Sequence, residues 1–196
     1  GTVGIMYNRT KLGKDITGWR DLIETVKAKN LKFTLLDDVR EVMGVGLMLN
    51  GHSVNSTDSA ELQQAADAII EMKPYVAAFT YDSRPMVVSG DVAAAHYFIG
   101  SMIDVFAHQK DLGYVIPEEG ATMYQEDICV LKTAPNKENA IKFMQFYTQP
   151  EIPALNMAQQ TNGTANMKAR ALTPDNIKNS EEINPPAETM KRLQIF

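Results

Sequence analysis

The stretch LKFTLLDDVREVMGVGLMLNG, residues 31–51, decides the fold class of this protein. Its first part, residues 31–37, is rich in Leu, Phe and Thr and predicts a buried strand. Apolar residues then recur at helical spacing over 39–51, and an Asn-Gly pair ends the pattern. Asp38 and Glu41 stand where the strand passes into the helix. A strand that leads directly into a helix predicts an α/β unit.

Strands and helices alternate over the rest of the chain as well. The predicted strands are short and rich in Val, Ile, Phe and Tyr, and they cover residues 2–8, 75–80, 91–99, 113–117 and 127–132. The predicted helices cover residues 19–29, 58–73 and 136–150, with further helices opened by Pro150 and after Pro186. This alternation predicts an α/β fold built on a mainly parallel sheet.

Composition and charge exclude several classes of function. The 196 residues carry a formal net charge of −5, which argues against nucleic acid because phosphate binding needs clustered Lys and Arg. No apolar run approaches the length of a membrane span. Cys129 is the only cysteine, and we expect it to be a buried strand residue rather than a zinc ligand. The three histidines show no ligand spacing, so we expect no metal and no cofactor.

The amino-terminal segment GTVGIMYN already has strand character. Since a natural chain seldom starts inside a secondary-structure element, we expect that these 196 residues are part of a longer protein.

Asp38 and Glu41 have a structural and a functional interpretation. Asp is a strong N-cap, and a Glu three residues later completes a capping box that stabilises a helix by about 1 kcal/mol. The same helix terminus favours ionised carboxylates, and side chains at this spacing lie near each other on one face. Both groups could therefore face one ammonium group. The two interpretations are compatible.

The segment YQED, residues 124–127, also places two carboxylates together, Glu126 and Asp127, beside an aromatic ring. Such a pair could act as a general acid and base, as in glycoside hydrolysis, or could be a solvated strand end. No G-x-S-x-G turn, no Cys paired with His and no Walker loop accompanies it. Tyr81 and Phe98 fall near strand ends, where a ring packs in the core or lines a cleft for a cation.

Along essentially its whole length the chain resembles the spermidine/putrescine-binding proteins of bacterial ABC transporters. The resemblance is carried, in order, by GTVGIMYN, WRDL, LLDDVREVMGVGL, NST, VIPEEG, NKENAIKFMQFYTQPE, ALTPDNIKN and PPAETMKRL. It implies a lobe of a type II periplasmic-binding protein, with a mixed, mainly parallel sheet flanked by helices. Residues 1–126 and 171–196 would form the second lobe, and residues 127–170 would be a crossover segment that completes the missing first lobe.

The resemblance also implies a set of ligand-binding residues. Asp38 and Glu41 fall on acids that bind one ammonium group of a polyamine, and Glu126 falls on an acid that contacts another. Tyr124 and Phe98 fall where the family often has tryptophans packed on the methylene chain. The remaining matches are Tyr81, at a small polar contact position, and Asn162, where a tyrosine is often found. The only tryptophan, Trp19, lies outside the site.

The implied function is that of an extracytoplasmic solute-binding component of an ABC importer, which binds putrescine or spermidine between two lobes and performs no chemistry. Its partners would be the polyamine and the transporter permease, and it would lie in the periplasm or be lipid-anchored outside the cytoplasmic membrane. The alternatives are a receptor of the same fold for another solute, and a hydrolase using Glu126 or Asp127 with Asp38.

A chain without its first lobe would leave apolar side chains of the crossover segment without partners, and we therefore expect it to self-associate. The side chains concerned are Ile128, Val130, Ile141, Met144 and Phe146.

Overall fold

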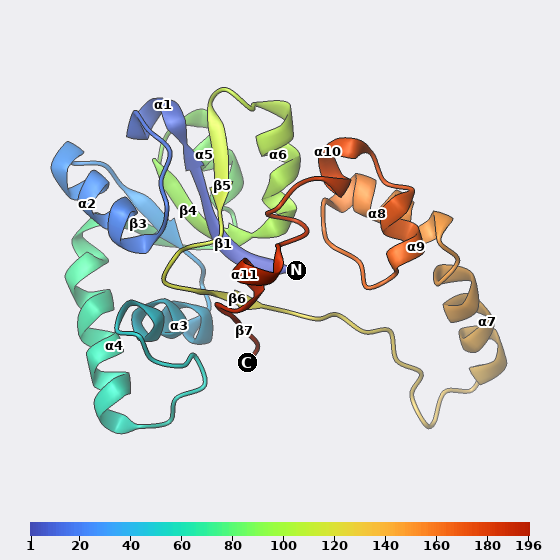
Figure 1. Ribbon diagram of the computed structural model, residues 1–196. Helices are drawn as coiled ribbons and strands as arrows, with labels where there is room; N and C mark the ends of the chain where they lie inside the picture. The colour runs from blue at the N-terminus through green and yellow to red at the C-terminus, as the bar shows by residue number, and fades with distance from the viewer.

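Seven strands form one sheet at the centre of the computed structural model, which describes residues 1–196 (Figure 1). The strand order is β3-β2-β4-β1-β6-β7, and β5 also pairs with β1. The strands are β1 Thr2–Asn8, β2 Phe33–Leu35, β3 Val76–Phe79, β4 Ala94–Phe98, β5 Leu112–Val115, β6 Ala121–Met123 and β7 Leu193–Gln194.

Six of the seven strands run in one direction, and β1 alone runs against them. β2 is parallel to both β3 and β4, and β6 is parallel to β7. β1 is antiparallel to β4 on one side and to β5 and β6 on the other. On that second side, β5 pairs with the carboxyl-terminal half of β1 and β6 with its first residues. The expected mixed, mainly parallel sheet is confirmed.

Alternate residues of the central strands enter two separate cores, one on each face of the sheet. Ile5 and Tyr7 of β1 belong to the first core, and Met6 between them belongs to the second. Helices α2 Trp19–Lys29, α3 Val39–Leu49 and α4 Ser59–Met72 cover the first face. Helices α5 Ser83–Ser89 and α6 Met102–Ala107 cover the second. The helices predicted over 19–29, 39–51 and 58–73 are thus present.

The remaining helices are α1 Arg9–Leu12, α7 Lys137–Tyr147, α8 Glu151–Gln160, α9 Met167–Ala171, α10 Asp175–Lys178 and α11 Ala187–Met190. Those expected from 136, Pro150 and Pro186 correspond to α7, α8 and α11. No helix is both long and apolar enough to cross a bilayer.

The prediction of a strand over 127–132 is wrong. After β6 the chain leaves the sheet as an extended stretch without strand pairing and runs to α7 (Figure 1). Cys129, expected to be buried in that strand, is exposed. Apolar residues form a strand only where the edge of another strand accepts their hydrogen bonds, and no edge lies beside this stretch.

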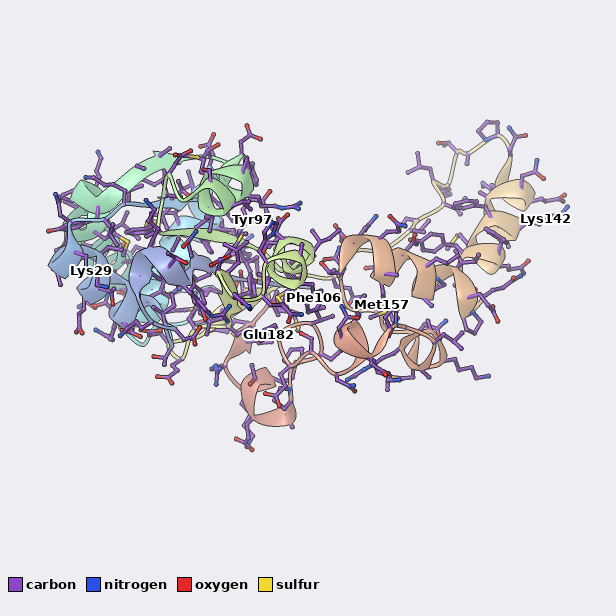
Figure 2. The ribbon with its side chains drawn as sticks, turned by 90° about the horizontal axis from the view of Figure 1, so that it is seen from above. Lys29, Tyr97, Phe106, Lys142, Met157 and Glu182 are labelled. Carbon is purple, nitrogen blue, oxygen red and sulfur yellow. The ribbon has the colours of Figure 1, made fainter.

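We call residues 1–123 the sheet region and residues 127–166 the arm. Seen from above, the arm extends away from the sheet region, with Lys142 at its far end and Lys29 at the opposite end of the molecule (Figure 2). Helix α7 buries none of its residues. The arm contacts the sheet region through Met157 of α8, which joins the second core together with Ile177 and Ile183, and through the Thr161 hydroxyl, which donates to the Gly100 carbonyl at 3.1 Å.

Candidate functional site

Four of the predicted ligand residues lie at or just after the ends of strands at one edge of the sheet. Asp38 comes shortly after β2, Tyr81 shortly after β3, and Tyr124 directly after β6, while Phe98 is the last residue of β4. Because these strands are parallel, their carboxyl ends share an edge. In open α/β sheets, ligands bind in the crevice outside that edge.

Asp38 caps helix α3, as the sequence predicts. Its Oδ1 accepts hydrogen bonds from the backbone N–H groups of Arg40 at 2.9 Å and Glu41 at 3.1 Å. Its second carboxylate oxygen accepts from the Tyr81 hydroxyl at 3.3 Å. The cap thus orients one oxygen into the helix and leaves the other on the side of Tyr81.

Glu41 does not lie beside Asp38 at the surface but below it. Its side chain is only 12% exposed, and its Oε2 accepts a hydrogen bond from the Thr122 hydroxyl of β6 at 2.7 Å. Burial raises the pKa of Glu41 above its usual range, and the charge of Asp38 acts in the same direction, whereas the Thr122 hydrogen bond opposes both. The two acids of one helical turn therefore have different environments.

Three aromatic rings continue the site from Asp38 across the sheet edge. Tyr81 stacks on Phe98 with ring centroids 6.2 Å apart and an interplanar angle of 8°. Phe98 meets Tyr124 edge to face at 5.7 Å. The Tyr124 hydroxyl donates to Asn162 Oδ1 at 3.4 Å, and partial burial together with nearby Glu126 raises the pKa of Tyr124 to about 12.

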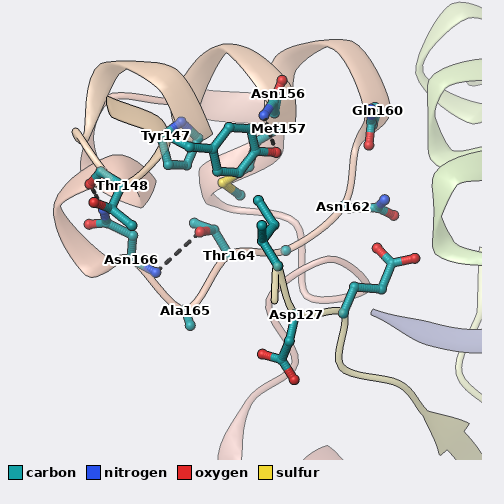
Figure 3. Close-up of a pocket in the computed structure, with 14 residues that line it drawn as sticks. Asp127, Tyr147, Thr148, Asn156, Met157, Gln160, Asn162, Thr164, Ala165 and Asn166 are labelled. Atoms are coloured by element: carbon teal, nitrogen blue, oxygen red, sulfur yellow. Dashed lines mark hydrogen bonds between the residues drawn. The ribbon is translucent and has the colours of Figure 1, made fainter. Parts of the chain in front are cut away.

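Glu126 is exposed and lies beyond this aromatic row, directly before the arm. It lines a polar pocket of about 450 Å³ between the extended stretch and helix α8 (Figure 3). Asn162, Asn156 and Gln160 contribute amide groups to the same pocket, which also holds Asp127. The structure therefore brings Asp38, Tyr81, Phe98 and Tyr124 into one row of contacts, with Glu41 beneath one end and Glu126 past the other.

Two residues at this site were not predicted from the sequence, Thr122 and His96. His96 of β4 is 2% exposed, its Nε2 lies 3.9 Å from Glu41 Oε2, and its ring meets Trp19 edge to face at 5.2 Å. Burial lowers the pKa of His96 to about 3, so the ring is neutral near pH 7. Trp19 itself lies in the core. Neither missed residue belongs to a motif, because the tertiary fold alone brings these two strands to helix α3.

No group of three or more His, Cys, Asp or Glu side chains is arranged to hold a metal ion.

Comparison with known proteins places the chain in a family. Residues 1–185 match the family described as bacterial extracellular solute-binding protein. The chain is 28% identical over 97% of its length to spermidine/putrescine-binding periplasmic protein 1 of Haemophilus influenzae, covering 53% of that protein. It is 30% identical over 91% of its length to the spermidine/putrescine-binding periplasmic protein of Escherichia coli, covering 51% of that protein.

A solved structure gives the same result. The substrate-binding protein PotD of a spermidine/putrescine ABC transporter from Streptococcus pneumoniae superimposes with a TM-score of 0.88 at 30% identity. The match covers 100% of this chain and 60% of that protein, so the chain spans about half the length of the curated relatives and somewhat more of this structure. The family match over residues 1–185 shows that the chain belongs to the bacterial extracellular solute-binding proteins.

Proposed function

We propose that this chain supplies one lobe of the extracytoplasmic solute-binding component of an ABC importer, and that it binds a polyamine such as putrescine or spermidine at the carboxyl edge of its sheet. The observation that carries the proposal is the row from Asp38 through Tyr81 and Phe98 to Tyr124. An acid begins this row, and a second acid, Glu126, follows it.

The chemistry of the row suits a polyamine. Such a ligand is a flexible chain whose ammonium groups are separated by methylene groups. Carboxylates at the two ends of the row can accept charge-assisted hydrogen bonds from ammonium groups. The rings of Tyr81, Phe98 and Tyr124 between them offer apolar surface to the methylenes and cation–π contacts of about 0.5–2 kcal/mol each.

No Lys or Arg side chain of the protein pairs with Asp38 at its end of the row. The Arg40 side chain, on the same helical turn as Asp38, points elsewhere: its guanidinium lies 4.4 Å from the Phe196 ring centroid, and its Nη2 donates to Asn55 Oδ1 at 3.2 Å. A positively charged ligand would supply the missing counter-charge.

The proposal includes a second lobe and a membrane partner. Residues 1–126 and 171–196 would form the lobe described, and residues 127–170 would cross to the other one. The assembled receptor would close on its ligand and deliver it to the permease of the transporter, either free in the periplasm or lipid-anchored outside the cytoplasmic membrane. The family is one of solute-binding proteins, and we propose no catalysis.

Two matched cap variants test the proposal by calorimetric titration of the complete protein with putrescine and spermidine. Asp58 caps α4 with the same geometry as Asp38, accepting from Ala60 N at 2.8 Å and Glu61 N at 3.1 Å. Asp38→Ala and Asp58→Ala should each lower the free energy of unfolding by about 1 kcal/mol. Only Asp38→Ala should weaken polyamine binding, by about tenfold or more, because it alone removes a ligand carboxylate.

Asp38→Asn refines the test, since asparagine caps helices about as well as aspartate but carries no charge. It should keep the stability and lose the affinity. Equal polyamine affinity of the wild type and both Asp38 variants would show that Asp38 is only a helix cap. Failure of the wild-type protein to bind either polyamine would overturn the proposed function.

A further inference from the structure

The Glu41 carboxyl group of α3 is packed against residues of two strands, β6 and β4. Thr122 of β6 donates to its Oε2 at 2.7 Å, and His96 of β4 lies behind it with Nε2 3.9 Å from the same oxygen. Thr122 and His96 are each 2% exposed. The Nδ1 atom of His96 is buried without a hydrogen-bond partner, so this ring is not part of a larger polar network.

No cationic side chain donates a hydrogen bond to the Glu41 carboxylate. On its own helix, Asp38 carries a like charge, and the Arg40 guanidinium is held over the Phe196 ring and offsets the negative charge of Glu41 only weakly. From β4, His96 is neutral because of its burial.

The remaining titratable neighbours are phenols. The Tyr81 hydroxyl donates to Asp38, and Tyr114 of β5 donates to the backbone carbonyls of Thr2 and Tyr97. Burial raises the pKa of Tyr114, so it stays neutral. The only polar group aimed at the Glu41 carboxylate is therefore the Thr122 hydroxyl.

We propose that binding of a ligand ammonium group to Glu41 is coupled to loss of the Glu41 proton. Thr122 is the positioning residue that orients the Glu41 carboxyl group and favours its ionised form. This inference rests on the proposed function. Below the Glu41 pKa of the free protein, a cation that enters displaces the carboxyl proton to the solvent and takes its place as counter-charge. Polyamine binding would then release protons in that pH range.

The direction of the pH dependence follows from the geometry. In the free protein, burial holds the Glu41 pKa above its usual range, and a bound ammonium group would lower it. The affinity should therefore be highest above the free-protein pKa and fall as the pH drops through it. The ligand stays charged throughout, since amines of this kind titrate near pH 10. His96, with a pKa of about 3, stays neutral over most of this range.

The experiment is titration of the complete protein with putrescine or spermidine between about pH 4.5 and about pH 8, in pairs of buffers with different ionisation enthalpies. The difference in heat between the buffers gives the number of protons released. For the wild type we expect proton release around the Glu41 pKa and weaker binding below it.

Variants separate positioning from folding. Thr122→Val keeps the shape but removes the hydroxyl, so the pH at which affinity falls should move upward by about one unit. Thr122→Ser should restore the wild-type profile. Glu41→Gln should abolish both the proton release and this part of the pH dependence. This variant tests the role of Glu41 independently if Thr122→Val does not fold.

A wild-type protein that binds polyamine with constant affinity and no proton release would overturn this inference and leave the proposed function standing. The same holds for an unshifted profile of folded Thr122→Val. Absence of polyamine binding at every pH would instead overturn the proposed function.

Discussion

The sheet region and the arm contain similar apolar patterns, but the apolar side chains are buried in the sheet region and exposed in the arm. In the sheet region, Phe33 is completely buried and belongs to a core that includes α2, α3 and α4. In the arm, Phe143 and Phe146 of α7 are 54% and 49% exposed, although the helix has the same length as α2 and α3. Apolar periodicity and helix propensity are enough to form a helix, but its apolar face becomes part of a core only where another element packs against it.

The comparison shows why the sheet region can position a site while the arm cannot do so alone. The row of rings and acids is held at the ends of β2, β4 and β6, whose residues are mostly buried, and of the half-exposed edge strand β3. The arm is attached to the sheet region only near its end, through Met157 in the second core and through Thr161, whose hydroxyl donates to the Gly100 carbonyl at 3.1 Å. A rigid site requires supporting side chains that are themselves locked by packing.

The largest expected effect is a direct measurement of this difference. Phe33→Ala should lower the free energy of unfolding by about 3–5 kcal/mol, because it leaves a cavity in a packed core. The matched change Phe143→Ala should alter it by less than about 0.5 kcal/mol. Urea denaturation followed by circular dichroism measures both. Similar losses for the two variants would mean that α7 is buried in solution.

A second test uses the cost of burying a titratable group in the sheet region. The pKa of His96 is lowered to about 3 in the folded protein, whereas an unfolded histidine titrates near pH 6.5. The unfolded chain therefore binds the extra proton, and stability should fall as the pH drops below about 6.5, by up to about 1.4 kcal/mol per pH unit. Denaturation curves across this range, for the wild type and His96→Gln, isolate the contribution. An unchanged slope in the variant would contradict it.

A third, smaller effect concerns the N-terminus of α2, which is capped by a side chain distant in the sequence, that of Glu119. Helix α2 has Gly18 at its N-cap, and the Glu119 carboxylate accepts from Trp19 N at 3.0 Å and Arg20 N at 2.8 Å instead. Glu119→Ala should lower the free energy of unfolding by about 1–2 kcal/mol. Glu118→Ala, at the exposed neighbouring position, serves as the control and should change little. Thermal denaturation measures both variants, and equal losses of stability would contradict the role of Glu119 as the cap of α2.

The weakest expected effect is association through the arm. Ile141, Phe143 and Phe146 expose apolar surface on α7, and Ile128 does so on the extended stretch. For the 196-residue chain by itself, we expect the average mass in light scattering to rise with concentration. The double variant Phe143→Ser/Phe146→Ser should reduce that rise. A monomeric mass at all concentrations of the wild-type chain would refute the expectation.

Elements with strong local signals were predictable. Strand β1 and helix α2 have the predicted bounds, and α3 begins directly after the predicted Asp38 cap. The short helices α5 and α6 were missed because six or seven residues hold too few turns for a periodic pattern. The prediction of a strand at 127–132 was wrong for the opposite reason: its apolar pattern is strong, but no strand of the sheet pairs with it.

The sequence by itself determined where the long helices α2, α3 and α4 start and which residues of β1 alternate between faces, because caps and periodicity act over a few neighbouring positions. Asp38 could therefore be assigned as a cap from LLDDVREV alone. Only the tertiary structure decided that Glu41 is buried against Thr122, which lies 81 positions away, with neutral His96 behind it. Burial and electrostatic environment depend on which strands the topology makes adjacent, and no local pattern encodes that adjacency.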